Sequence, residues 1–165
     1  MGSPENSTAE GWLVACPFFM PIEKLEGGSW LHAHRLPLGG GWNGHCTAPG
    51  HEGEAPSEEE LREFCNLGYA EGCGRLPRRR EWDSIRFDAR TLPGEGKSAT
   101  NGRIQLRYVC ERGHRPAEHG ILEFDVATTR WERSHRDHRV QRMAECFLDA
   151  YLDKRKMREV IPEAS

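Results

Sequence analysis

The stretch Ile104-Gln105-Leu106-Arg107-Tyr108-Val109-Cys110 decides the fold, because every second residue from Ile104 to Cys110 is apolar. Successive side chains of a β-strand point to opposite faces of a sheet, so residues two apart share a face. The alternation therefore predicts a β-strand that presents Ile104, Leu106, Tyr108 and Cys110 to a core.

Two further strands are predicted on either side of this one. Ile85 and Phe87 alternate with polar residues before it, and the sequence from Leu122 to Val126 alternates after it. The intervening segments carry turn residues, including Pro93-Gly94, and we expect Gly113 to Gly120 to form a loop. Because strands adjacent in sequence usually pair, residues 82–131 predict an antiparallel β-meander.

A long helix is predicted from about Ser134 to Met157, with Ser134 and Asp137 at its start. Its apolar stripe at helical spacing is Val140, Met143, Ala144, Phe147, Leu148, Tyr151 and Leu152. Cys146 lies off this stripe, so we expect it to be exposed or at a partner surface. The predicted fold class is α+β: a small antiparallel β-meander packed by a long C-terminal α-helix, with an irregular Cys/Gly/Pro-rich N-terminal half.

The chain before residue 82 shows little periodicity. We expect residues 1–10 to form a disordered tail and residues 11–160 a single domain, made of a cysteine-rich half (11–81) and the sheet with its helix (82–160). One helix is predicted in the first half, because Ser57 and Glu60 match a capping box. It should end near Gly68, which places Cys65 in its last turn.

Four cysteines are spread through this irregular half: Cys16, Cys46, Cys65 and Cys73. Segments poor in core residues need something to hold them, and four thiolates around a metal centre would do so. Cys16 precedes Pro17, and a glycine-rich run precedes Cys46; both flanks favour a [4Fe–4S] cluster over the alternative, zinc. Ordinary buried thiols and disulfides are the competing interpretations.

A second, weaker metal site is suggested by Cys110, His114 and His119, which lie within ten residues. Histidine is a common metal ligand near neutral pH, and an enzyme with a histidine-containing metal site is a third interpretation of the chain. The competing interpretations are a core position for Cys110 and solvated histidines in a polar loop.

Charge is unevenly distributed although the formal net charge is only −3. Residues 52–71 contain seven carboxylates and one arginine, whereas residues 75–115 contain eleven basic and five acidic residues. We expect a protein partner, such as a redox subunit, and expect any contact with nucleic acid to involve Arg78, Arg79 and Arg80.

The sequence contains no P-loop, dinucleotide-binding fingerprint, nucleophile elbow or zinc-protease motif. We therefore expect a small iron–sulfur protein that acts in electron transfer or as an accessory subunit of a redox complex, and not as an enzyme by itself. The alternative is a zinc-stabilised module that contacts protein or nucleic acid. The polar N-terminus and the lack of a long apolar run predict a cytoplasmic protein without a membrane segment.

Overall fold

The computed structural model describes residues 14–25, 36–67, 72–92 and 102–160. The predicted disordered tail at 1–10 lies outside these residues. The elements are β1 (Phe19–Lys24), β2 (Trp42–Cys46), α1 (Glu58–Glu60), the π-helical turn η3 (Leu61–Cys65), β3 (Ser84–Leu92), β4 (Arg103–Arg112), β5 (Arg115–Asp125), β6 (Arg130–Arg133) and α2 (His138–Val160). None of the helices in these residues is long and apolar enough to cross a membrane.

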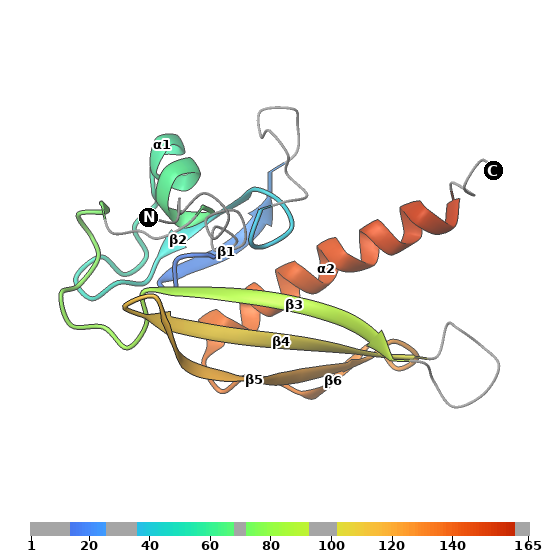
Figure 1. Ribbon diagram of the computed structural model, residues 1–165. Helices are drawn as coiled ribbons and strands as arrows, with labels where there is room; N and C mark the ends of the chain where they lie inside the picture. Colours follow the sequence, from blue (N-terminus) through green and yellow to red (C-terminus); the bar gives the residue numbers. More distant parts are fainter. Residues whose placement is uncertain (1–13, 26–35, 68–71, 93–101, 161–165) are drawn as a thin grey trace, which may run out of the picture.

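Strands β3 to β6 form a four-stranded antiparallel meander in sequence order, as predicted (Figure 1). The expected alternation sets the register, since Ile85 is opposite Cys110 and Leu106 is opposite Leu122. The sequence did not predict β6. It also placed a loop at 113–120, whereas β4 and β5 are joined by Gly113 and His114 alone and β5 begins at Arg115.

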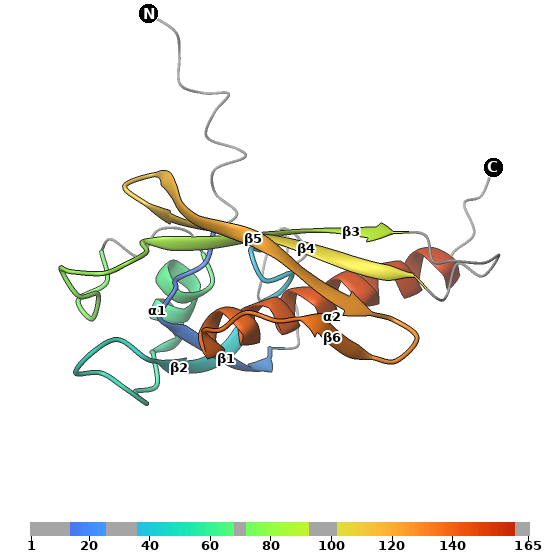
Figure 2. The ribbon, with the colours of Figure 1, turned by 90° about the horizontal axis from the view of Figure 1, so that it is seen from below.

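Helix α2 covers one face of this sheet (Figure 2). Residues of its apolar stripe pack against that face. A buried cluster joins the two elements and comprises Ile104, Leu106, Leu122, Phe124, Ala144 and Leu148. The helix begins at His138, later than predicted, because the Asp137 side chain accepts a hydrogen bond from the Arg139 amide (2.8 Å). Asp137, not Ser134, is therefore the N-cap.

A second sheet of β1 and β2, absent from our sequence prediction, packs against the other side of α2. The Arg142 guanidinium donates to the carbonyl oxygens of Pro21 (2.9 Å) and Ile22 (2.8 Å), and so ties α2 to β1. Gly44 permits the close pairing of the two strands, since a Cβ there would lie 2.0 Å from the Met20 carbonyl oxygen. Helix α2 is consequently covered on both sides.

This double cover corrects the expectation for Cys146, which is fully buried rather than exposed. Its cluster includes Phe19 and Trp42 from the β1–β2 side and Ile85 from the four-stranded sheet. The apolar stripe alone could not show this, because it identifies only the side of the helix that faces one sheet.

Candidate metal centre

The four cysteines of the N-terminal half line one small cavity. Cys16 follows a bridge between Ala15 and Ile85, Cys46 ends β2, Cys65 ends η3, and Cys73 lies in the segment after it. The cavity has a volume of about 20 Å³, and its other lining residues are Phe18, Phe19, Pro56, Glu60, Phe64 and Arg75. The fold thus gathers the four thiols that the sequence singled out.

Main-chain pairing brings the first three cysteine segments together. The Cys16 amide donates to the Cys65 carbonyl oxygen (3.4 Å), and Phe19 in β1 is the register partner of Cys46 in β2. Thr47 then secures the segment after Cys16, because both its amide (2.8 Å) and its hydroxyl (2.7 Å) donate to the Phe18 carbonyl oxygen. These contacts are long-range, so they depend on the folded chain.

The position of Cys65 is fixed by the ends of its helix. The predicted capping box is confirmed, since the Ser57 and Glu60 side chains and amides bond reciprocally. At the other end the buried Asn66 side chain donates to the carbonyl oxygens of Leu61 and Trp42 and accepts from the Trp42 amide, each at 3.0 Å. A π-helical turn of this kind is frequent at functional sites. Asn66 therefore locks the turn carrying Cys65 onto β2.

Burial makes the metal-free thiols hard to ionise. Desolvation, together with the neighbouring thiols of Cys46 and Cys73, raises the pKa of Cys16 to about 12, while backbone hydrogen bonds at Phe18 and Phe19 act in the opposite direction. Burial also raises the pKa of Cys65, and the proximity of the other three thiols adds to the effect. A bound cation reverses this situation, because a coordinating thiol is deprotonated outright.

Backbone amides point at two of the sulfur atoms. The Ala48 amide donates to Cys46 Sγ (3.4 Å). A backbone hydrogen bond at Phe18 lowers the pKa of the Cys16 thiol, and the Phe19 amide donates to the Cys16 carbonyl oxygen (3.2 Å). Hydrogen bonds to ligating sulfur atoms orient the ligands and set the reduction potential of iron–sulfur centres. The cavity therefore carries donors suited to thiolate sulfur.

Arg75 covers the same cavity and was not identified from the sequence. Its guanidinium pairs with Glu54 (2.9 Å) and with Glu60. The Glu54 carbonyl oxygen also accepts from the Cys46 amide (2.9 Å), and Glu60 belongs to the helix that leads to Cys65. Arg75 thus connects the segments of Cys46, Cys65 and Cys73, and its charge is balanced by these two carboxylates. Its position two residues after Cys73 was the available sequence signal.

The thiols do not form the compact set that one metal ion requires. Four thiolates around zinc lie about 2.3 Å from the metal, which places the sulfur atoms only about 3.8 Å apart. Within the described segments, no group of three or more His, Cys, Asp or Glu side chains could hold a metal ion. All six cysteines are free thiols, so the disulfide interpretation is wrong for this structure.

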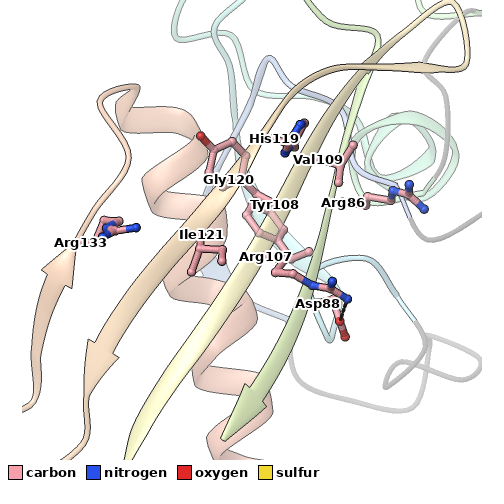
Figure 3. Close-up of a pocket in the computed structure, with 10 residues that line it drawn as sticks. Arg86, Asp88, Arg107, Tyr108, Val109, His119, Gly120, Ile121 and Arg133 are labelled. Atoms are coloured by element: carbon pink, nitrogen blue, oxygen red, sulfur yellow. Dashed lines mark hydrogen bonds and ion pairs between the residues drawn. The ribbon is translucent and has the colours of Figure 1, made fainter. Parts of the chain in front are cut away.

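The second predicted set is not brought together. Cys110 is buried against α2, as the core interpretation anticipated, whereas His119 is the register partner of Val109 on the opposite face of the sheet. Figure 3 shows His119 beside a wide cavity of about 1070 Å³ on that outer face. His114 is exposed in the β4–β5 turn, so Cys110, His114 and His119 do not converge on one site.

The three consecutive arginines lie between Cys73 and β3. Arg78 and Arg79 are exposed, while Arg80 donates to Asp83 Oδ1 (2.5 Å) and to the Pro77 carbonyl oxygen (2.9 Å).

No known family, curated protein or solved structure matches this chain.

Proposed function

We propose that the protein binds a [4Fe–4S] cluster through Cys16, Cys46, Cys65 and Cys73 and serves in electron transfer, alone or as an accessory subunit of a redox complex. The observation that carries this proposal is the shared cavity lined by all four thiols. Four cysteine ligands leave no open iron position, which favours electron transfer or a structural role over substrate chemistry.

The preference for a cluster over a single zinc ion rests on the sequence around the cysteines. Cys16 precedes Pro17, and a glycine-rich run precedes Cys46, which are flanks typical of cluster ligands. The cavity of about 20 Å³ holds little more than one water molecule, so the cysteine segments would have to move apart when a four-iron cluster binds.

The surroundings of the thiols match the needs of a bound cluster, which would supply reversible one-electron chemistry. Phe18, Phe19 and Phe64 exclude water from the cavity, and the backbone amides near Cys16 and Cys46 donate toward sulfur. Arg75 is paired with Glu54 and Glu60, so it ties together the segments around the cavity and adds no net positive charge to it.

Anaerobic purification or reconstitution, followed by a visible spectrum and metal analysis of the same sample, tests the proposal. We expect a brown protein with about four irons per chain that dithionite bleaches. Cys65→Ser should lose the iron, while Cys146→Ser, which alters a buried thiol outside the cavity, should keep it. A colourless protein with one zinc per chain would replace the cluster by the zinc-stabilised module, and a folded, metal-free protein would refute both.

A further inference from the structure

We propose that an exposed arginine surface beside the cysteine cavity docks an acidic protein that exchanges electrons with the bound cluster; this inference rests on the proposed function. The arginine surface consists of Arg78, Arg79, Arg112, His114 and Arg115, all of them exposed. It combines two segments that are more than thirty residues apart in the sequence.

One carboxylate holds the two segments together. Asp83 Oδ2 accepts from the Gly113 amide at the β4–β5 turn (2.6 Å), and Asp83 Oδ1 accepts from Arg80 Nε (2.5 Å). The loop that carries Arg78 and Arg79 therefore lies beside the hairpin tip. The positive charges of both segments contribute to one region of the surface.

Positive charges repel one another at the tip of the β4–β5 hairpin. Arg112 and Arg115 are register partners directly across the turn, and like charges in such a pair are destabilising. Gly113 and His114 have φ values of 60° and 62°, the geometry of the two-residue hairpin turn that brings these two arginines together. An acidic partner would relieve the repulsion between the two arginines.

Nearby carboxylates leave a positive balance on the arginine surface. Arg80 pairs with Asp83, and Glu81 lines the adjoining cavity. Among the described residues, no ion pair involves Arg78, Arg79, Arg112 or Arg115. The excess charge therefore lies on the exposed arginines, and it complements carboxylates on a partner.

The arginine surface adjoins the cysteine cavity through Phe18. Arg79 lines a cavity of about 220 Å³ together with Pro17, Phe18 and Trp82, and Phe18 also lines the cysteine cavity. Phe18 lies only two residues after Cys16, and the Arg139 guanidinium lies 5.1 Å from the centre of its ring. In the step that this surface would serve, one electron passes from the reduced cluster to the partner's one-electron acceptor, with no bond made or broken and no proton transferred.

A protein fits this surface better than a nucleic acid. Single strands are bound by exposed aromatic rings that stack on bases, whereas Trp82 is only 6% exposed and no fully exposed aromatic ring accompanies the five residues of the arginine surface. The adjoining cavity is smaller than the roughly 300 Å³ typical of small-molecule sites. Its three prolines (Pro17, Pro49 and Pro77) and its arginines suit a protruding acidic side chain of a protein.

Electron-transfer kinetics with charged small oxidants test the surface directly. Iron-loaded protein is reduced and mixed in a stopped-flow instrument with ferricyanide, an anion, or with tris(phenanthroline)cobalt(III), a cation. At low ionic strength the Arg79→Gln/Arg112→Gln variant should react with ferricyanide about three- to tenfold more slowly and with the cobalt complex faster, and high salt should remove both differences. The matched control is Arg130→Gln/Arg133→Gln in β6, which also removes two exposed arginines but lies away from the arginine surface, and it should leave both rates nearly unchanged.

Equal ferricyanide rates for the Arg79→Gln/Arg112→Gln variant and the Arg130→Gln/Arg133→Gln control would overturn the proposal. A second measurement compares the binding of a glutamate-rich peptide with that of a short DNA duplex by fluorescence anisotropy. We expect the peptide to bind more weakly to the Arg79→Gln/Arg112→Gln variant than to the control; a duplex that binds tightly where the peptide does not would assign the surface to nucleic acid instead. The two proposals can fail separately. Iron analysis tests the proposed function, whereas peptide binding tests the arginine surface and can be measured whether or not iron is present.

Discussion

The two sides of α2 are built in different ways. On one side the four-stranded sheet buries apolar residues such as Leu106 and Leu122 in regular register, and main-chain ladders satisfy its polar groups. On the other side short elements are held by side chains that bond to the main chain, including Asn66, Thr47 and Arg142. The comparison teaches that periodic burial suffices for the sheet side, while the cysteine side depends on individual polar contacts.

The largest effect is expected from opening a cavity on the sheet side. Leu106→Ala removes a fully buried side chain from the centre of β4 and should lower the free energy of unfolding by about 2–5 kcal/mol. Val109→Ala, on the outer face of the same strand, should lower the free energy of unfolding by less than about 1 kcal/mol. Chemical denaturation of metal-loaded and metal-free protein measures both. If Leu106→Ala destabilised metal-free and metal-loaded protein to very different extents, the stability of the sheet side would depend on the cysteine side, and the comparison would fail.

The next effect probes the polar contacts of the cysteine side. Asn66→Ala leaves the buried amide and carbonyl groups of Trp42 without their partner and should cost about 1–3 kcal/mol. Hydrogen exchange should accelerate in β2 and η3 but not in β4 and β5. Asn43→Ala is the control, because that exposed side chain bonds only to the amide of the next residue. Uniform acceleration along the chain would contradict a local role for Asn66.

The stability of the cysteine side should depend on alkaline pH, because its thiols have raised pKa values in the folded protein. The Cys16 thiol has a folded pKa of about 12 against an ordinary value of 9.0, so its contribution to stability is fully present below pH 9.0 and is lost as the pH rises toward 12. One pH unit above 9.0, linkage gives a loss of about 1.4 kcal/mol for this thiol. Thermal unfolding of metal-free protein should show the loss, and Cys16→Ser should remove it. Iron-loaded protein should be less sensitive, because its thiols are already deprotonated; identical alkaline profiles for the two forms would argue against metal ligation by Cys16.

The smallest effect concerns the helix that the two sides share. Asp137→Ala removes the N-cap of α2 and should cost about 1 kcal/mol. Amide exchange should increase in the first turn of α2. Because α2 is covered on both sides, any change in the two sheets should be similar. Asp153→Ala, an exposed position farther along α2, is the control and should change the stability little. A larger loss for Asp153→Ala than for Asp137→Ala would contradict the assigned cap.

Prediction from sequence succeeded where the signal is local. The alternation around Leu106 and the capping box of Ser57 and Glu60 involve residues close in the chain, and both are present in the structure. Strands β1 and β2 were missed because Pro21 and Gly44 interrupt any alternation, and these strands are stabilised by pairing with each other and by Arg142. The burial of Cys146 was missed for the same reason, since it depends on that second sheet.

The sequence by itself determined the antiparallel meander, the covering helix and the choice of four cysteines as a candidate set, because periodicity and composition are properties of neighbouring residues. Only the tertiary structure decided that these four thiols line one cavity, that Arg75 lies beside them, and that Cys110 and His119 face opposite sides of a sheet. Contacts such as the hydrogen bond from the Cys16 amide to the Cys65 carbonyl oxygen join segments far apart in the chain. Their formation depends on how the whole chain packs, and no local pattern records it.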